Sequence, residues 1–293
     1  MTTKQSCDEI SVDRLAGILR RVRVSAHVFH SGALPKTVRY DGTDGRGFLH
    51  VVREGCLGLR LDDGTFHQIS APAMVLLARP LAHAVAADTG ALIIASAGID
   101  LGGEANPLAQ ALPAVLVLPL DRPDDGAALA ALADLLFAEA GQRHCGHQVI
   151  IDRLAEAILV GVLRRAMDFV EPGHSPGPHP RLGLLAGLSH PRLAVALTAM
   201  HDAPERDWSL ESLADAASLS RSVFADTFHQ VVGMPPGQYL SGWRMVLAKQ
   251  ALQQGHPLKQ VAGQVGYASA AALSRAISRH FGANARALIK ALR

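Results

Sequence analysis

Short apolar runs separated by turn residues fill the chain from residue 37 to about residue 118. The runs lie at residues 48–53, 56–61, 65–70, 73–78, 91–97 and 115–118. Between them stand Gly-, Pro- and Asp-containing turn signals at 54–55, 62–64, 71–72, 79–80 and 88–90. Short strands at this spacing predict an all-β sandwich or small barrel. No helical pattern lies between the runs, which argues against a doubly wound parallel sheet.

The periodicity changes to that of helices at about residue 127. Residues 127–140 and 148–169 carry apolar residues at helical spacing and are joined by a short segment at 141–146. We expect an antiparallel helical pair. The second helix is apolar over more than the stripe that one surface helix needs. This breadth indicates a dimer interface, or else packing against the chain's own barrel.

A proline-rich segment at residues 171–181, EPGHSPGPHPR, follows the helical pair. Its four prolines exclude a regular helix or a sheet strand. It predicts a linker between two domains.

The chain after the linker contains a helix–turn–helix pattern. Ser209 can cap a first helix, and Ser220 can cap a second helix that ends at Gly233. The expected buried positions are Leu210, Leu213, Ala214 and Ala217 in the first helix, Leu219 in the turn, and Val223, Phe224 and Phe228 in the second helix.

The same pattern occurs a second time, 48 to 49 residues later. The expected buried positions are Leu258, Val261, Ala262, Val265, Tyr267, Ala272, Leu273, Ala276 and Ile277. Ser269 is the cap of the second helix, and Gly282 follows it by the same 13 residues that separate Ser220 from Gly233. This repetition indicates a duplicated helix-turn-helix. Residues 236–253 read as one connecting helix of roughly 27 Å, which is near the ~34 Å repeat of successive major grooves.

The net charge of +2 hides an uneven distribution. Residues 1–189 hold 17 basic and 20 acidic side chains, whereas residues 190–293 hold 11 and 6. From residue 220 onward Asp226 is the one acidic residue among nine basic ones. Such a segment is suited to a polyanion, because neutralised phosphates release counterions.

From Trp208 onward, about 85 residues resemble the DNA-binding domain of AraC/XylS-type transcription regulators. The matching stretches are WSLESLADAASLSRSVFADTFHQVVGMPPGQYLSGWRMVLAKQAL and VAGQVGYASAAALSRAISRHFG. They contain a G-x-x-P-x-x-Y-L step at Gly233, Pro236, Tyr239 and Leu240, which is followed by Trp243-Arg244-Met245. The resemblance implies a homodimer that binds double-stranded DNA, responds to an unknown small-molecule effector and acts on RNA polymerase. The cysteine usage, which offers no disulfide framework, predicts a location in the reducing cytoplasm.

The resemblance and the helix pattern together select the expected DNA contacts. They are Ser220, Arg221, Ser222, Ala225, Asp226, His229, Arg244, Ser269, Ala270, Ala271, Ser274, Arg275 and Arg279. Asp226 departs from the family, which usually has a basic residue at this position. A carboxylate here is repelled by phosphate and can at best accept a hydrogen bond from a cytosine amino group. The second helix of the second unit has Arg275, the arginine that is usual in the family, but its other exposed positions carry short side chains. The family's closing Gly-x-x-Pro reads Gly282-Ala283-Asn284-Ala285, so specificity is expected to be looser or shifted toward DNA shape.

The first 170 residues more loosely resemble cupin-type sensor domains. The matching stretches are FLHVVREGCLGLRLDDG and ISAPAMVLLARPLAHAV. In a cupin, His50 and His83 would fall in the two metal-ligand motifs, and His27, His30 or His67 would be candidates for a third ligand. A barrel without metal is the alternative that we favour, so no cofactor is expected.

Cysteine chemistry gives a weaker hypothesis. The three cysteines form no pairing framework, and Cys56 reads as a small core residue. Cys145 lies between Arg143-His144 and Gly146-His147, where neighbouring cations could activate a thiol or the side chains could hold a metal. The remaining interpretation is a loop without a redox or metal role.

These observations predict an α+β two-domain protein that is not an enzyme. The expected parts are a cupin-like barrel or jelly roll at 1–126, a helical pair at 127–170, a linker at 171–181 and an all-α domain at 182–293, with helix-turn-helix units at 209–232 and 257–281. The alternatives are a metal-dependent cupin enzyme with an accessory helical domain, and a helical module that binds protein. The first residues lack signal-peptide order and no apolar stretch reaches ~20 residues, so no membrane association is expected.

Overall fold

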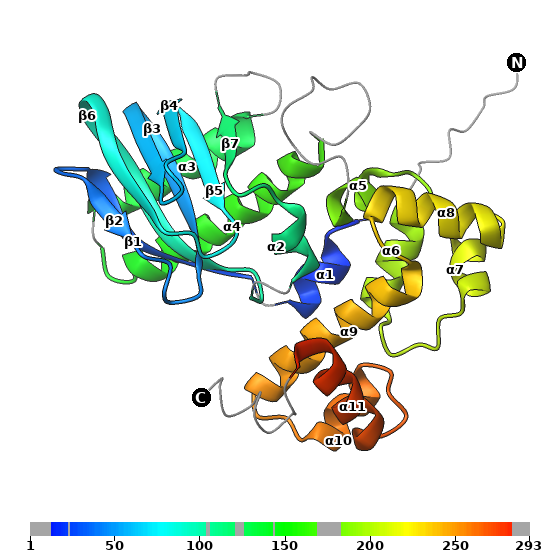
Figure 1. Ribbon diagram of the computed structural model, residues 1–293. Coiled ribbons are helices and arrows are strands. Elements are labelled where there is room, and N and C mark those ends of the chain that lie inside the picture. Colours follow the sequence, from blue (N-terminus) through cyan, green and yellow to red (C-terminus); the bar gives the residue numbers. More distant parts are fainter. Residues whose placement is uncertain are drawn as a thin grey trace, which may run out of the picture.

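The computed structural model describes residues 13–22, 24–103, 106–120, 126–142, 144–168 and 183–282. The predicted linker at 171–181 and Cys7 lie outside these ranges. A sheet with two helices packed on it forms the N-terminal part, and the C-terminal part is helical (Figure 1). None of the described helices is long and apolar enough to cross a lipid bilayer.

The elements follow one another in this order. The N-terminal part contains α1 (Ala16–Arg21), β1 (Ser25–Ala33), β2 (Val38–Tyr40), β3 (Gly47–Leu61), β4 (Phe66–Ser70), β5 (Ala73–Leu77), β6 (His83–Asp100), α2 (Pro107–Ala111), β7 (Leu116–Pro119), α3 (Ala127–Gln142) and α4 (His147–Asp168). The C-terminal part contains α5 (Leu184–Ser189), α6 (Leu193–Asp202), α7 (Leu210–Ala216), α8 (Arg221–Val232), α9 (Pro236–Gln253), α10 (Leu258–Gln264) and α11 (Ala270–Phe281).

The sheet is antiparallel and is built around the long strands β3 and β6. Its strand order is β1-β6-β3-β5-β7, and β2 and β4 pair with the far halves of β6 and β3. The interior face buries a compact apolar cluster that includes Val52, Leu59, Val85 and Ile94. This sheet-rich, cupin-like domain confirms the predicted fold class.

Two predicted turns in this sheet were wrong. Residues 54–55 and 88–90 lie within β3 and β6, where the pairing passes from Glu54–Ile93 to Cys56–Thr89 with irregular register. Gly55 (φ +89°) allows the bend, since a Cβ atom there would lie 2.1 Å from the Ala91 carbonyl oxygen. Glycine signals therefore mark bulges in two long bent strands. The predicted runs 48–53 and 56–61 are one strand, and the predicted run 91–97 is the second half of β6.

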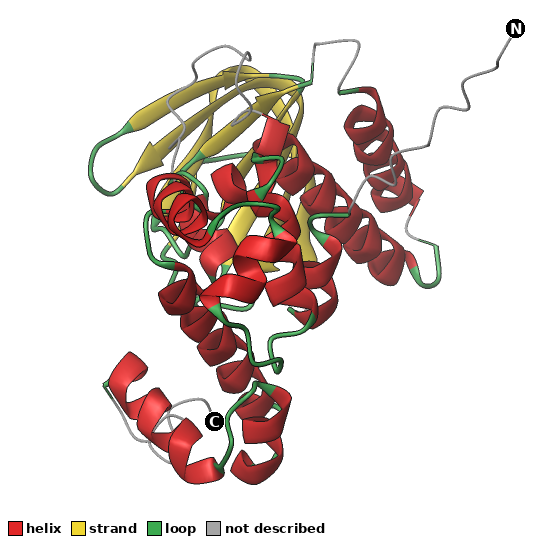
Figure 2. Ribbon diagram, turned by 90° about the vertical axis from the view of Figure 1, so that its right-hand side faces the viewer, coloured by secondary structure: helices red, strands yellow, loops and turns green. Residues whose placement is uncertain are grey.

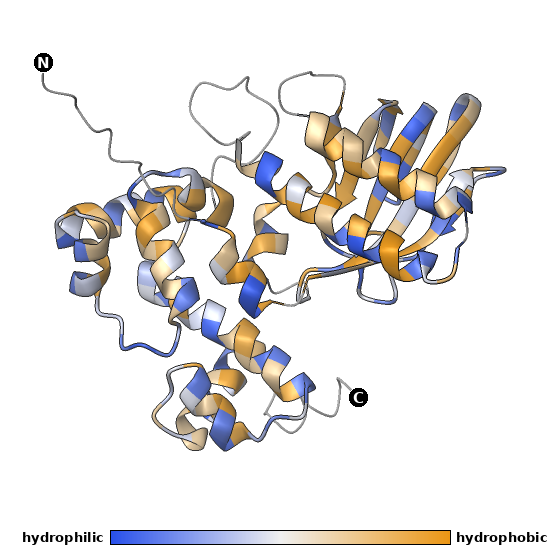
Figure 3. Cartoon of the chain, turned by 180° about the vertical axis from the view of Figure 1, so that it is seen from behind, coloured by the Kyte–Doolittle hydropathy of each residue, from blue (hydrophilic) through white to orange (hydrophobic). Residues whose placement is uncertain are grey.

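The predicted helical pair, α3 and α4, packs against the outer face of the sheet (Figure 3). The apolar residues of α4 that suggested a dimer interface, such as Ile158, Leu159 and Val162, are buried within the chain. Their burial corresponds to the alternative of packing on the chain's own barrel. The breadth of the apolar face therefore gives no support to a dimer.

The four helices of the two expected helix-turn-helix units form as the sequence pattern predicts. The hydroxyls of Ser209, Ser220 and Ser269 accept hydrogen bonds from backbone N–H groups three residues later. Gly233 and Gly282 end α8 and α11 in the left-handed conformation.

Leu210, expected to be buried in the first unit, is 37% exposed. Val223 was also expected to be buried, but it is 49% exposed. It immediately precedes the buried Phe224 on α8, so its side chain leaves the core on the adjacent side of the helix. A one-residue error in the apolar face explains the wrong prediction.

The N-terminal helix α1 packs on α6 of the helical part. Arg20 forms an ion pair with Asp202 at 3.0 Å, and the Arg21 guanidinium donates to the Asp202 carbonyl oxygen. Gly17 permits this approach, since a Cβ atom there would lie 2.8 Å from Asp202 Oδ1. At a second junction, the hydroxyl of Ser189 in α5 donates to the Met167 carbonyl oxygen of α4. The sheet domain therefore contacts the helical domain through both α1 and α4.

Candidate nucleic-acid interface

The second unit presents an arginine-bearing face on α11. Arg275 and Arg279 are one helical turn apart and exposed, while Leu273 and Ile277 anchor the opposite side of the helix in the core. Among the described residues neither arginine forms an ion pair. Both guanidinium groups are thus available to an anion from outside the chain.

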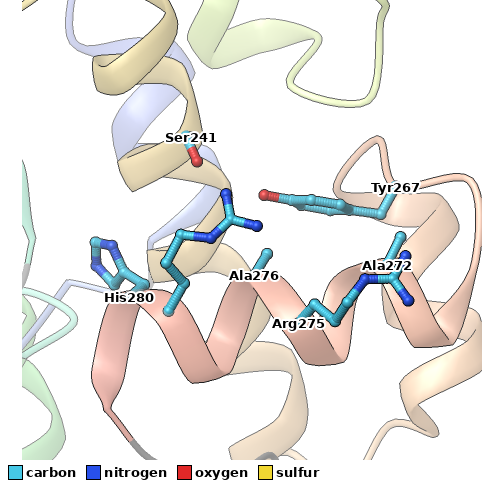
Figure 4. A pocket seen from close by; sticks show the side chains of 7 residues that line it. Ser241, Tyr267, Ala272, Arg275, Ala276 and His280 are labelled. Atoms are coloured by element: carbon cyan, nitrogen blue, oxygen red, sulfur yellow. The ribbon is translucent and has the colours of Figure 1, made fainter.

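A polar cavity of about 450 Å³ lies between α11 and α9. It is lined by Ser241, Tyr267, Ala272, Arg275, Ala276, Arg279 and His280. In Figure 4 the Ser241 hydroxyl and the Tyr267 phenol face α11 across the cavity. Two guanidinium groups and two hydroxyl donors around one cavity match the hydrogen-bonding needs of a phosphate. No sequence signal marks Ser241, and the apolar position of Tyr267 in the turn predicts a core residue instead.

The other expected contacts of the second unit surround this face. Ser269 and Ala271 are exposed, and Ala270 and Ser274 are partly exposed. Short side chains leave room for a close approach to DNA and can touch thymine methyl groups.

The first unit presents a face of mixed charge on α8. Ser220, Arg221, Ser222, Asp226 and His229 are exposed, and Ala225 is partly exposed. The exposed Val223 lies among them, so this surface also carries an apolar group that sequence analysis assigned to the core. The two units thus differ in charge, since Asp226 opposes Arg221 on α8 and no acidic residue stands on α11.

Arg244 is placed differently from the other expected contacts. Its Nε donates to the Pro204 carbonyl oxygen at 2.7 Å and its Nη2 to the Arg206 carbonyl oxygen at 2.8 Å. Its guanidinium also lies 5.9 Å from the ring centre of Tyr267. Burial lowers the pKa of Arg244, although the side chain stays charged. Arg244 therefore ties the segment before α7 to α9 and to the turn of the second unit, and a DNA-contact role does not follow from its position.

The two units are carried by the 18-residue helix α9 (Figure 2). Trp243 and Met245 of this helix are buried, so α9 is part of the core of both units. The spacing between α8 and α11 is therefore set by packing rather than by a flexible connection.

The two cupin-motif histidines meet inside the sheet domain. His50 Nε2 lies 3.0 Å from His83 Nε2, His50 Nδ1 lies 2.9 Å from Ser96 Oγ, and the Leu81 carbonyl oxygen lies 2.7 Å from His83 Nδ1. A carbonyl oxygen can only accept, so His83 is protonated at Nδ1 and its Nε2 accepts from His50. Burial lowers the pKa of His50 to about 3 and also lowers the pKa of His83.

This pair does not fit a cupin metal centre. Both Nε2 atoms are used in one hydrogen bond, and the described residues contain no group of three or more His, Cys, Asp or Glu side chains arranged to hold a metal. His27, a candidate third ligand, pairs instead with Asp152 at 3.0 Å. The geometry describes two neutral, hydrogen-bonded imidazoles.

Cys145 is exposed in the turn between α3 and α4. His144 is exposed beside it, and His147 Nδ1 donates to the His144 carbonyl oxygen at 3.0 Å. Arg143 lies outside the described residues. The proposed redox role of Cys145 stays a prediction.

Each of the two parts of the chain matches a known protein family. Residues 13–168 match the family described as Cupin, and residues 213–291 match the family described as Helix-turn-helix domain. The N-terminal half therefore belongs to the cupin family. The C-terminal helix-turn-helix domain is similar to that of proteins named as AraC-like transcription regulators.

Several proteins similar to this chain are named as transcription regulators. A Streptomyces lividans protein described as an AraC-like transcription regulator is 37% identical over 187 residues, which is 63% of this chain and 59% of the relative. The Escherichia coli K12 activator RclR, described as RCS-specific, is 26% identical over 236 residues, 80% of each chain. The DNA-binding domain of AdpA, solved with a target DNA, is 30% identical and covers 35% of this chain and 93% of that domain, with a TM-score of 0.33. This chain thus spans about three fifths of the length of the Streptomyces relative.

Proposed function

We propose that this protein is a sequence-specific, double-stranded-DNA-binding transcription regulator rather than an enzyme. The observation that carries the proposal is the pair of capped helix-turn-helix units fixed on one helix, α9, with two arginines on α11 that form no ion pair with any residue the structure describes. An arrangement of this kind lets two helices reach successive major grooves on one face of the duplex.

The second unit supplies most of the affinity in this mechanism. Arg275 contacts a base or a phosphate, and Arg279 with the hydroxyls of Tyr267 and Ser241 holds a backbone phosphate. The first unit contributes Arg221 and the small exposed face around it, while Asp226 weakens its attraction to phosphate.

The sheet domain receives a small-molecule signal and transmits it through its contacts with α5 and α6. The Arg20–Asp202 pair and the Ser189–Met167 hydrogen bond support this route. A ligand can shift the equilibrium between two arrangements of the domains only by the difference between its binding free energies for them. The protein acts in the cytoplasm as a homodimer that contacts RNA polymerase, and it needs no bound cofactor. The rival cupin-enzyme reading lacks a third metal ligand among the described residues.

A gel-shift assay with the full chain and DNA from upstream of its own gene tests the proposal. We expect saturable binding that outcompetes random DNA and weakens steeply with salt. Arg275→Ala should weaken binding about tenfold to a hundredfold and reduce the slope of log affinity against log salt by about one.

Arg60→Ala is the matched control, since Arg60 is an exposed arginine on the sheet domain over the ring of Phe66. It should leave DNA binding unchanged. Binding of the specific DNA no tighter than random DNA, or equal affinities for Arg275→Ala and the unmodified chain, would contradict the proposal.

A further inference from the structure

An open cleft at the mouth of the sheet domain is lined by aromatic and acidic side chains. Phe29, Arg39, Tyr40, Asp41, Asp44 and Phe48 surround about 500 Å³, and we call this the aromatic cleft. The Tyr40 ring lies between the other two rings, with centres 5.6 Å from Phe29 and 5.0 Å from Phe48. The volume is within the range of small-molecule sites.

A β-bulge puts Phe29 into this cleft. In the pairing of β1 with β6, Val28 stands opposite Ala97 and His30 opposite Ser96, so Phe29 is an extra residue without a partner. Bulges commonly re-aim a side chain near a functional site. The ring of Phe29 stays 46% exposed, whereas the preceding residue, Val28, is buried.

Helix α4 holds the bulge in place. The Asp152 carboxylate accepts from the Val28 N–H at 2.9 Å, and the Gln148 amide donates to the Val28 carbonyl oxygen at 2.9 Å. Gln148 also donates to Asp152 at 3.0 Å. These bonds tie the backbone of Val28, the residue before the bulge, to α4, so the position of Phe29 is coupled to α4.

The floor of the cleft is aromatic and uncharged. The Tyr40 ring centre lies 5.0 Å from that of His83 and 5.7 Å from that of His50. Both histidines are neutral at pH 7, because burial lowers the pKa of each. The Ser96 hydroxyl hydrogen-bonds to His50 Nδ1 at 2.9 Å. The floor therefore offers π faces to a ligand and no cation.

The rim of the cleft has an excess of negative charge. Arg39 is already paired, since both oxygens of Asp62 lie 2.9 Å from its Nη2. Hydrogen bonds from the Thr43 N–H and hydroxyl lower the pKa of Asp41 and keep it ionised. Aromatic faces and carboxylates together attract an organic ammonium group, through cation–π contact and direct charge attraction.

We propose that the aromatic cleft binds a small organic cation, in which an ammonium group is attached to an apolar or aromatic body. The proposal rests on the proposed function, since this ligand would be the signal that the regulator receives. Its body packs on Phe29 and Tyr40, and its ammonium group faces Asp41 and Asp44. The bulge then transmits ligand binding through Asp152 to α4, whose Met167 carbonyl oxygen is bonded to Ser189 of α5.

Calorimetric titration of the full chain without DNA tests the site. The probes are 2-phenylethylammonium, the neutral 2-phenylethanol and the anionic phenylacetate, which share a ring and differ in charge. We expect the cation to bind at least tenfold more tightly than either of the other probes. Phe29→Ala and Asp41→Asn should each weaken its binding by about tenfold.

The chain offers a matched control for each variant. Phe66 on β4 is also 46% exposed, and Asp63 accepts a hydrogen bond from the Thr65 N–H at 2.8 Å as Asp41 does from the Thr43 N–H at 3.0 Å. Phe66→Ala and Asp63→Asn should leave binding of the cation unchanged.

Equal or tighter binding of the neutral or anionic probe would overturn the proposal, and so would unchanged binding in Phe29→Ala. Absence of binding by all three probes at millimolar concentration would also overturn it. Because these titrations contain no DNA, their failure leaves the gel-shift test of DNA binding untouched. A chain that binds the cation but not DNA would instead contradict the proposed function.

Discussion

The guanidinium of Arg244 fills the space that a side chain on Gly266 would occupy. A Cβ atom on Gly266 would lie 2.7 Å from Arg244 Nη2 and 2.9 Å from the Glu205 carbonyl oxygen. Gly266 has φ +76°, which favours glycine in any case. The turn of the second unit is thus packed directly on Arg244, which also holds the segment at residues 204–206 that precedes the first unit.

Arg244→Met should destabilise the protein without removing a DNA contact. The substitution leaves the Pro204 carbonyl oxygen without its donor and removes one of the two donors to the Arg206 carbonyl oxygen, which costs about 1–3 kcal/mol of unfolding free energy. Urea unfolding measures this loss. The slope of log DNA affinity against log salt should stay unchanged; a slope reduced by about one would show that Arg244 contacts phosphate.

Gly266→Ala should produce a similar loss, because the methyl group displaces Arg244 and strains a left-handed backbone. We expect a decrease in unfolding free energy of about 1–3 kcal/mol. In the double variant with Arg244→Met the two losses should be less than additive, since both substitutions break the same contact. Additive losses would mean that the two residues act independently. Gly263→Ala on α10, where a Cβ atom meets open space, is the control.

Asp226→Arg should strengthen DNA binding through the first unit. Asp226 is exposed on α8, and the change replaces repulsion from phosphate by attraction. The salt slope should grow by about one or more. Asp134→Arg on the exposed side of α3 controls for the change in net charge. Equal effects of the two variants in a gel shift would place α8 away from the DNA.

Acid should destabilise the fold through two buried histidines. Burial lowers the pKa of His50 and of His201 to about 3, from an ordinary value of 6.5. The unfolded chain therefore takes up protons first as the pH falls, and stability is lost between about pH 6.5 and pH 3. From pH 7.5 to 5.5 the two groups together should remove about 3 kcal/mol of unfolding free energy.

Urea unfolding across this pH range, repeated with His50→Gln and with His201→Gln, checks the assignment. Each variant should lose about half of the pH dependence, whatever its overall stability. A variant whose unfolding free energy keeps the full pH dependence would show that the substituted histidine does not cause it.

Dialysis against a chelator should leave both stability and DNA binding unchanged. His50 and His83 bond to each other, and the described residues show no third ligand near them. A thermal unfolding curve and a gel shift before and after EDTA treatment measure the effect. A decrease in melting temperature that zinc restores would contradict the prediction.

Much of the helical domain was determined by local sequence. Three helices begin at a serine whose hydroxyl precedes an apolar periodic run, and two of them end at a glycine: Ser209, Ser220 and Ser269, and Gly233 and Gly282. Both effects could be predicted because they depend only on neighbouring backbone groups. The connecting helix at 236–253 was predicted with its observed bounds for the same reason. The duplicated pattern was therefore visible without any tertiary information.

The tertiary structure decided what local patterns leave open. Sequence alone could not distinguish a turn at 54–55 from a bulge, because glycine suits both and strand pairing selects between them. It could not show that α4 buries its broad face on its own sheet, that Arg244 donates to Pro204 and Arg206, or that Phe29 is turned into a cleft. Each of these depends on groups distant in the chain, whose positions follow from packing rather than from neighbouring residues.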